Sequence, residues 1–381
     1  MSAADLTTAI VDGAHAPAGL AEDRLALWTI ERDHWSPRTI TVTDAAGTVL
    51  ATALTAGRPH TAYRKVVDFV VAEGAGDSAE AAAIAALEAA RDDRLANDDG
   101  SQPAPIVIRF EEHPAQAALT AVVRSALATV GFAQDADSLP SVPSTRPEDA
   151  AFTRSWSLWL SAAPTRAVPY YGQTTDVTCG AVTSLMMFEE NDLGQFSTDG
   201  TENHTVELDF WRRATNMPAC EPIGLAVTTA EELLARTGDA GRKPRVILSA
   251  EGPVLLEWYD DFYERKLRVQ LQEESLRTAE SLGLEVERRW ASTEEIRDLV
   301  AAGNDVFLLI ALEPLIKDPA AHWVLAHDVV GDSIIISDPW VEQEHGESWV
   351  DTSALPIPLA GIDLITRWGE PEYRGIIVVP R

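Results

Sequence analysis

The chain has 381 residues, of which 46% are hydrophobic and 24% charged, and its formal net charge is −30. This length exceeds what one ordinary hydrophobic core supports, so we expect two soluble globular domains. The acidic surface would repel nucleic acid and anionic membranes, and the sequence holds no run of about 18 apolar residues that could span a bilayer. These features exclude nucleic-acid-binding and membrane-spanning classes. They leave a solvated acidic surface or a preference for a cationic partner.

Cysteine and histidine usage limits the cofactor chemistry. The two cysteines, Cys179 and Cys220, are too few for a disulfide framework, and a reducing cytoplasm fits them best. They lack the spacing of metal ligands and the eight histidines are scattered, so we expect neither a zinc site nor another cofactor. The first residues lack a basic region followed by an apolar one, so we expect no secretory signal.

The first part of the chain predicts a mixed α/β domain behind a loose, alanine-rich leader at residues 1–20. Its apolar patterns predict, in chain order, a strand at 24–31, two strands around a turn at 38–54, a strand, turn and helix at 64–95, a strand at 105–110, a helix at 113–132 and a strand at 152–161. Ser78 is the expected N-cap of the first of these helices.

A candidate domain boundary follows. The stretch 134–150 is rich in Pro, Ser and Asp, so it is a linker or a long loop. If the strand at 152–161 closes the first sheet, the boundary lies near residue 163; otherwise it lies near 145. We place it at 163, which gives domains at 21–163 and 164–381.

The second part of the chain again mixes helices and strands. Its patterns predict a helix at 228–237, a strand at 244–250, a long helix near 264–282, a helix opened by a capping box at Ser292 and Glu295, a strand at 305–312 and two strands around a tight turn at 322–340.

The stretch "VPYYGQTTDVTCGAVTSLMMF" places a cysteine at the start of a predicted helix. Asp176 or Thr178 can cap this helix, with Cys179 in its first turn and Val182, Leu185 and Met186 as a buried stripe. A helix N-terminus carries about half a positive charge, which stabilises a reactive thiolate. Cys179 is therefore either a nucleophile or a small buried hydrophobic residue.

An amide side chain precedes this cysteine by six residues. Acyl chemistry needs hydrogen-bond donors for the oxyanion, and a side-chain amide together with a backbone N–H can supply them. Gln173 lies in the loop that enters the helix, so its amide can fold back beside the sulfur. The N–H of Cys179 is the natural second donor.

The predicted hairpin at 322–340 can supply a base and its orienting carboxylate. A three-residue turn at 329–331, with Gly331 at positive φ, would set His322 directly opposite Asp338. A two-residue turn would instead offset the pair by three positions, onto opposite faces. His327 is the rival base, but on a regular strand it faces away from the side that His322 occupies.

Taken together, Gln173, Cys179-Gly180, His322 and Asp338-Pro339 resemble the active-site pattern of the bacteriocin-processing cysteine peptidases. These papain-like domains cut double-glycine leader peptides. The blocks "ELDFWRRATN", "CEPIGLAV" and "HWVLAHDVV" further resemble a bacterial subgroup of peptidase-like proteins of unassigned function. The resemblance implies a papain-like α/β (α+β) fold for the second domain.

The same resemblance implies the roles of four residues: Cys179 as nucleophile, His322 as base, Asp338 as orienter and Gln173 as oxyanion donor. The expected activity is a cysteine-dependent hydrolase of a peptide or small amide, with a cationic substrate as one option. The alternatives are an acyltransferase or transpeptidase with the same residues, or a non-catalytic peptide-binding protein. The chain lacks the membrane spans and the P-loop of the transporter-linked peptidases, so leader-peptide specificity does not follow.

The first domain resembles a GNAT-type acetyltransferase in the order of its elements. In that family a glycine-rich turn before a helix grips the pyrophosphate of acetyl-CoA. Here the turn "EGAGDSAE" lacks the family spacing and places Glu73, Asp77 and Glu80 where the pyrophosphate would lie. We therefore expect a degenerate, non-catalytic module.

Overall fold

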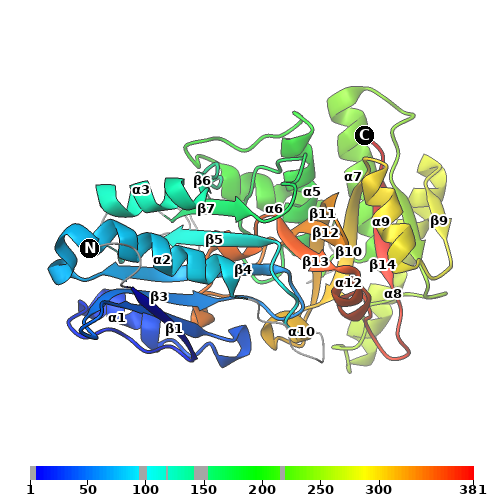
Figure 1. The fold of residues 1–381 in the computed structure, drawn as a ribbon. Coiled ribbons are helices and arrows are strands. Elements are labelled where there is room, and N and C mark those ends of the chain that lie inside the picture. Colours follow the sequence, from blue (N-terminus) through cyan, green and yellow to red (C-terminus); the bar gives the residue numbers. More distant parts are fainter. Residues whose placement is uncertain (1–5, 94–100, 117–118, 141–152, 215–218) are drawn as a thin grey trace. The chain divides into compact units, whose positions relative to one another are not determined.

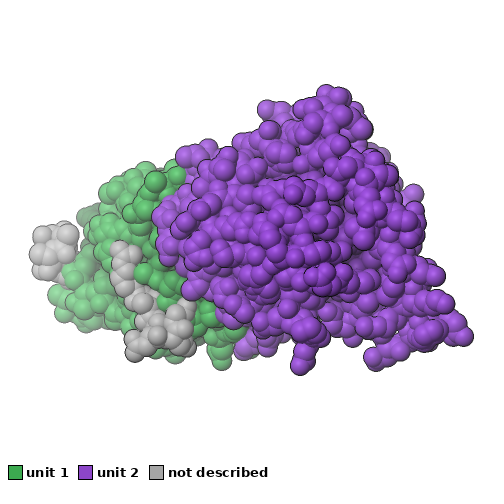
Figure 2. Space-filling view, turned by 90° about the vertical axis from the view of Figure 1, so that its right-hand side faces the viewer, with its two compact units in different colours: residues 1–137, 148–163, 341–351 green, residues 138–147, 164–340, 352–381 purple. Residues whose placement is uncertain are grey.

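The structure is a computed structural model, and it describes residues 6–93, 101–116, 119–140, 153–214 and 219–381. The chain forms two compact units (Figure 2). Unit 1 consists of 1–137, 148–163 and 341–351, and unit 2 of 138–147, 164–340 and 352–381. Among the described residues, no helix combines the length and apolarity needed to cross a membrane.

Unit 1 is built on a seven-stranded sheet in the order β1-β2-β3-β4-β5-β7-β6 (Figure 1). The strands are β1 (Thr7–Asp12), β2 (Arg38–Thr43), β3 (Val49–Ala56), β4 (Tyr63–Val71), β5 (Val107–Glu112), β6 (Ala133–Gln134) and β7 (Arg154–Trp159). Neighbouring strands are antiparallel except for β4 and β5, which are parallel. The strand predicted at 152–161 is β7, which pairs with β5.

Helices α2 (Ala79–Asp92) and α3 (Ala121–Val130) share a hydrophobic core with this sheet. The alanines of α2 pack against strand residues such as Val66, Ile108 and Phe110, because small side chains let the helix approach the sheet closely. The turn before α2 is η3 (Glu73–Ser78), and Ser78 occupies the predicted N-cap position, although its side chain makes no capping hydrogen bond.

Two expectations for the first part of the chain were wrong. The stretch 24–31, predicted as a strand, forms helix α1 (Glu22–Thr29). The helix places Arg24 and Trp28 on one face, and both bind the buried carboxylate of Asp68, at 2.9 and 2.7 Å. The leader, expected to be loose, contains strand β1, which pairs with β2 along its length.

Unit 1 takes the segment Val341–Asp351 from a distant part of the chain. Its Glu347 is buried and accepts hydrogen bonds from Arg58 at 2.5 Å and from Trp35 at 2.7 Å. The same segment contains η4 (Gln343–His345), whose His345 ring stacks on Trp35. The second half of this segment, from Glu347 to Asp351, is therefore buried within unit 1.

A second buried network ties the segment to β4 and β5. Lys65 donates to both Asp351 and Glu111, at 2.5 and 2.6 Å, and all three side chains are buried. Tyr63 donates to Asp351 at 2.7 Å, and Ser348 donates to Glu111 at 2.5 Å. Through Lys65 on β4 and Glu111 on β5, these two strands are thus bound to Ser348 and Asp351 of the segment.

Unit 2 is built on a second seven-stranded sheet in the order β13-β12-β11-β10-β14-β8-β9. The strands are β8 (Arg245–Leu248), β9 (Glu285–Glu287), β10 (Asp305–Ala311), β11 (Ala321–Val330), β12 (Ser333–Ser337), β13 (Leu355–Pro358) and β14 (Gly375–Val379). Only β8 and β9 pair in parallel.

Some helices of unit 2 pack on this sheet, and others pack on neighbouring helices (Figure 1). They are α5 (Cys179–Glu190), α6 (Asn203–Ala214), α7 (Pro222–Thr237), α8 (Phe262–Leu282), α9 (Thr293–Ala301), α10 (Glu313–Ile316) and α12 (Leu359–Ile365), while the short α11 (Trp349–Thr352) belongs mostly to unit 1. Helix α5 packs on β11 and between α6 and α7. The predicted cap of α9 is confirmed, since Ser292 accepts from the N–H of Glu295.

Replacing Lys65 by Met should destabilise unit 1, because Glu111 and Asp351 would stay buried together without their shared cation. Removing one partner of a buried ion pair costs about 3–5 kcal/mol, which corresponds to about 100-fold or more in an opening equilibrium. We expect amide hydrogen exchange in β4 and β5 of the full chain to accelerate by about that factor, as measured by mass spectrometry. As control, Arg91→Met removes the surface pair with Asp92 and should change exchange by less than about fivefold. Exchange as slow as in the wild type would contradict the role of Lys65.

Candidate active site

Helix α5 begins at Cys179, with Thr178 at the N-cap position. Every residue from 179 to 188 is buried, so the helix is buried on all sides and not only along the predicted apolar stripe. The side chain of Thr178 makes no capping bond, because its hydroxyl is turned to Glu207. Cys179 is the first residue of this buried helix and is itself 8% exposed. Its thiol therefore lies at the positive end of the helix dipole.

His322 lies between the carboxylate of Asp338 and the thiol of Cys179. Its Nε2 is 2.7 Å from Asp338 Oδ1, and Cys179 is close enough to influence the charge of the ring. Burial by itself lowers the pKa of His322, but the charges and hydrogen bonds of Asp338 and Cys179 raise it to about 10. At neutral pH the buried ring therefore carries a positive charge beside the sulfur.

The hairpin that carries His322 turns differently from the prediction. The turn has two residues, Gly331 and Asp332, with Val330 opposite Ser333. The predicted three-residue turn is therefore wrong, although Gly331 does have a positive φ of 60°. A two-residue turn satisfies the same glycine preference and keeps one more pair in the ladder.

A β-bulge brings His322 and Asp338 back onto one face. The register of β11 and β12 shifts by one residue at His327, and beyond the shift Leu325 lies opposite Ser337. Asp338 is then the diagonal neighbour of His322 rather than its direct partner. Diagonal neighbours on one face are still within reach of long side chains, as the 2.7 Å contact shows.

The carboxylate of Asp338 is fixed by its surroundings. Its Oδ1 also accepts from the N–H of Trp340 at 2.8 Å. Its own N–H donates to the carbonyl of Thr352 at 3.0 Å, and its carbonyl accepts from the hydroxyl of Tyr170 at 2.9 Å. Asp338 is fully buried, so these bonds hold the charge in one place.

Gln173 lies beside the loop that follows Asp338, since its N–H donates to the carbonyl of Pro339 at 2.9 Å. Its side-chain Nε2 donates to the carbonyl of Thr175 at 2.7 Å, and its Oε1 is buried without a partner. The structure thus brings the backbone of Gln173 to the Asp338 loop. Its role as oxyanion donor to a substrate on Cys179 stays a prediction.

The rival base, His327, has a different environment. It is fully buried, and its Nε2 lies 3.4 Å from the hydroxyl of Ser337. Burial and the charge of Arg166 lower the pKa of His327 to about 3, so its ring is neutral at physiological pH. His327 is the residue that the bulge inserts, and it takes no part in the pair of His322 and Asp338.

Cys220, the second cysteine, packs against the start of α5. A Cβ at Gly180 would lie 2.9 Å from the Cβ and 3.2 Å from the Sγ of Cys220, so only glycine allows this approach. The carbonyl of Cys220 accepts from the indole of Trp323, which is a core residue on β11. Cys220 is 1% exposed and less accessible than Cys179.

Sequence reasoning assigned no role to Glu207, which the structure places behind the loop between Gln173 and Cys179. It is fully buried on α6 and binds Thr174 and Thr178 of that loop and Tyr171 just before it. Burial raises the pKa of Glu207, and the hydrogen bonds that it accepts lower it in part. The signal in the sequence was its spacing: Glu207, Phe210 and Ala214 share one helical face, and all three are buried.

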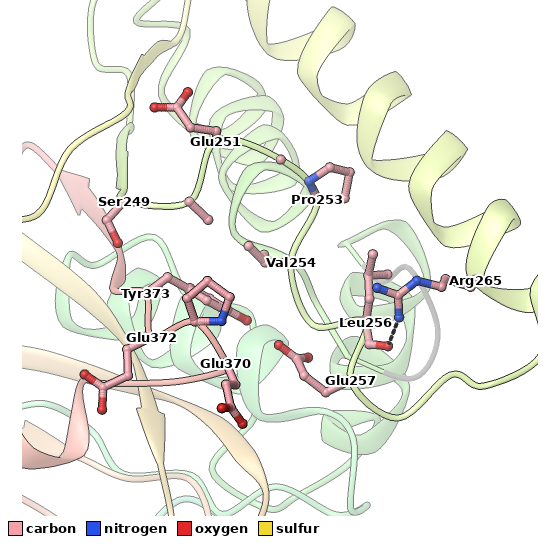
Figure 3. Close-up of a pocket in the computed structure, with 13 residues that line it drawn as sticks. Ser249, Glu251, Pro253, Val254, Leu256, Glu257, Arg265, Glu370, Glu372 and Tyr373 are labelled. Carbon is pink, nitrogen blue, oxygen red and sulfur yellow. Dashed lines mark hydrogen bonds between the residues drawn. The ribbon is translucent and has the colours of Figure 1, made fainter.

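A cavity of about 640 Å³ lies at the end of β8 and the start of β14, near the first turn of α8 (Figure 3). Its glutamates are Glu251, Glu257, Glu370 and Glu372, all exposed. The guanidinium of Arg265 donates to the carbonyl of Leu256 at its wall. None of the four predicted site residues lines this cavity. Within the part of the chain that the structure describes, no group of three or more His, Cys, Asp or Glu could hold a metal ion.

Comparisons with solved structures find acetyltransferases for the N-terminal region. The ribosomal-protein-S18-alanine N-acetyltransferase of Escherichia coli matches 41% of this chain and 96% of its own, with 15% identity and a TM-score of 0.26. A GNAT-family protein from Desulfovibrio desulfuricans matches 41% of this chain and 100% of its own, with 15% identity and a TM-score of 0.27. Both structures are described as acetyltransferases, the class that the element order of the first domain resembles.

The comparison with protein families concerns the region that holds Cys179, His322 and Asp338. No curated protein matches the sequence. Residues 168–380 match the model described as the Peptidase_C39 like family. Because this match spans more than half of the 381 residues, the chain belongs to the Peptidase_C39 like family.

Proposed function

We propose that this protein is a cysteine-dependent hydrolase of amide or peptide bonds, with Cys179 as nucleophile, His322 as base and Asp338 as orienter. The observation that carries the proposal is the position of His322, buried, hydrogen-bonded to Asp338 and close enough to Cys179 for the two groups to influence each other's charge. A thiol nucleophile needs an adjacent base, and that base needs a third group to orient it. A cation this deeply buried beside a thiol also supports the reactive thiolate.

In the proposed reaction the sulfur of Cys179 attacks the amide carbonyl carbon, and the carbonyl oxygen becomes an oxyanion. The C–N bond then breaks, and the imidazolium of His322 gives its Nδ1 proton to the leaving amine. This leaves a thioester on Cys179 and a neutral imidazole. Water, deprotonated by His322, attacks the thioester, releases the acid and restores the thiolate and imidazolium pair.

Two donors would stabilise the oxyanion. Cys179 is the first residue of α5, so its N–H has no acceptor within the helix. Gln173 Nε2 has a second hydrogen beyond the one that it gives to Thr175. Loss of one such donor costs acyl-transfer enzymes about 10²–10³ in rate.

We propose a peptide or small amide as substrate, and the net charge of −30 favours a cationic one. An amine in place of water would complete an acyl transfer with the same residues. Neither cysteine forms a disulfide, which suits a reducing cytoplasm as the place of action. For unit 1 we propose a non-catalytic role.

Iodoacetamide should label Cys179 much faster than Cys220 at pH 6.5, because an imidazolium stabilises a neighbouring thiolate. The pKa of His322 is raised to about 10, so its charge is present below that pH and lost above it. The labelling rate should therefore stay nearly constant from pH 6.5 to 9, measured by peptide mass spectrometry. In His322→Gln the rate should fall at pH 6.5 and rise with pH like that of a free cysteine. Equal labelling of both cysteines would refute the assignment of the nucleophile.

Incubation with a mixed peptide library should give an acyl adduct on Cys179, detected by intact mass, and cleaved peptides. Asp338→Asn should keep the fold but disturb the tautomer and orientation of His322, with a loss of up to about 10⁴ in rate. That loss should remain smaller than the loss for Cys179→Ala. Added amines separate hydrolysis from transfer, because transfer would yield new amides. A protein that binds peptides without any adduct or cleavage would support the binding-protein alternative instead.

Acetyl-CoA should not bind unit 1 with a dissociation constant below about 1 mM at physiological salt. The turn η3 and the first turn of α2 expose Glu73, Asp77 and Glu80, and their charge opposes a pyrophosphate. Calorimetry with the full chain measures this directly. A micromolar dissociation constant would show a second active site.

A further inference from the structure

We infer that Glu207 is a positioning residue that sets the oxyanion side of the site, an inference that rests on the proposed function. Its carboxylate binds the residue after Gln173 and the residue before Cys179. Oε1 accepts from the N–H of Thr174 at 2.9 Å and from the hydroxyl of Thr178. Gln173 and Cys179, which would supply the oxyanion donors, therefore each adjoin a residue that is hydrogen-bonded to Glu207.

The second carboxylate oxygen of Glu207 accepts two further hydrogen bonds from the same stretch. Oε2 accepts from the hydroxyl of Thr174 at 2.8 Å and from the hydroxyl of Tyr171 at 3.0 Å. Because Thr174 uses its hydrogen on Glu207, the 2.6 Å contact with His204 Nδ1 assigns the proton of that bond to His204. Four donors thus converge on one carboxylate, and all four belong to the stretch 171–178, while His204 supports Thr174 from behind.

This carboxylate is not explained as half of an ion pair. Glu207 is fully buried, and no cationic side chain among the described residues lies within salt-bridge distance of it. A buried carboxylate is costly unless hydrogen bonds satisfy it, so its four donors must keep their places for the charge to be tolerated. A stretch held in this way has little freedom, which is what a pre-organised oxyanion site requires.

The inference predicts a selective chemical defect. Acylation passes through an oxyanion and depends on the placement of Gln173 and the N–H of Cys179. Alkylation by iodoacetamide displaces iodide from carbon and forms no oxyanion. A residue that positions the oxyanion donors should therefore affect acylation far more than alkylation. A residue that only supports the fold or the thiol should affect both alike or neither.

The test uses two small probes that need no knowledge of the substrate. p-Nitrophenyl acetate acylates the thiol: the sulfur bonds to the acetyl carbon, the ester C–O bond breaks, and p-nitrophenolate leaves. Iodoacetamide reports the reactivity of the thiol alone. In Glu207→Gln one carboxylate oxygen becomes an N–H₂ that cannot accept, so two of the four donors lose their acceptor or, where they are hydroxyls, must turn to accept instead. We expect the acylation rate of Cys179 in the full chain to fall by about 100-fold. Alkylation should change by less than about threefold.

The matched control is Asp209→Asn, on the same helix but exposed, which should change neither rate. Thr178→Val keeps the shape of the loop while removing one donor. It should therefore also lower the acylation rate with little change in the alkylation rate, even if Glu207→Gln does not fold. Gln173→Ala should also show the split, and adding Glu207→Gln to it should cost little more, because both changes remove one function.

The outcomes separate the two proposals. Acylation that is unchanged in both Glu207→Gln and Thr178→Val, or that falls only in parallel with alkylation, would overturn the role of Glu207. Additive losses in the double variant would also overturn it, since they would show action independent of Gln173. If neither probe reacts with Cys179 in the wild-type protein, the proposed thiol chemistry itself fails, and the inference fails with it.

Discussion

The buried pair of His322 and Asp338 is the interaction on which the site depends. Removing two charges from water costs several kcal/mol for each ion, and their attraction offsets this only with close geometry and further hydrogen bonds. Here the 2.7 Å contact supplies the attraction, and the N–H of Trp340 supplies a further bond to the carboxylate. Cys179 adds a third group that favours the imidazolium. The arrangement that would activate the thiol is thus also the one that makes the buried charges tolerable.

The stretch before Cys179 is likewise fixed by hydrogen bonds to groups that are distant in the sequence. Gln173 is bound through its backbone to Pro339, the residue after the orienting carboxylate. Thr174 and Thr178 are bound to Glu207 on α6. Two segments that are far apart in the sequence, the one at Pro339 and helix α6, therefore fix one loop. Electrostatic stabilisation of an oxyanion works only when the donors are in place beforehand, and such cross-links supply that order.

How far the site could be predicted depended on which signals are local. Cys179 before an apolar helix and His322 on a strand were visible because helix and strand periodicities are local. The bulge at His327 was not visible, since a strand sequence carries no mark of where its ladder gains a residue. The pairing with Asp338 was predicted with the wrong register because both the length of the turn and the bulge differ from the prediction. The role of Glu207 was not predicted, because the function of an acidic residue on an apolar helix face can be recognised only when its distant hydrogen-bond donors are known.

Unit 1 shows the same limit on a larger scale. Buried Arg58 and Lys65 obtain carboxylate partners from Val341–Asp351, and nothing near either cation in the sequence points to so distant a segment. A chain ending at residue 163 would keep both cations and lose Glu347 and Asp351. Leaving buried charges short of their partners costs several kcal/mol, while a whole domain is stable by only about 5–15 kcal/mol. The segment 341–351 is therefore a condition for the stability of unit 1, although the chain reaches it only after β12 of unit 2.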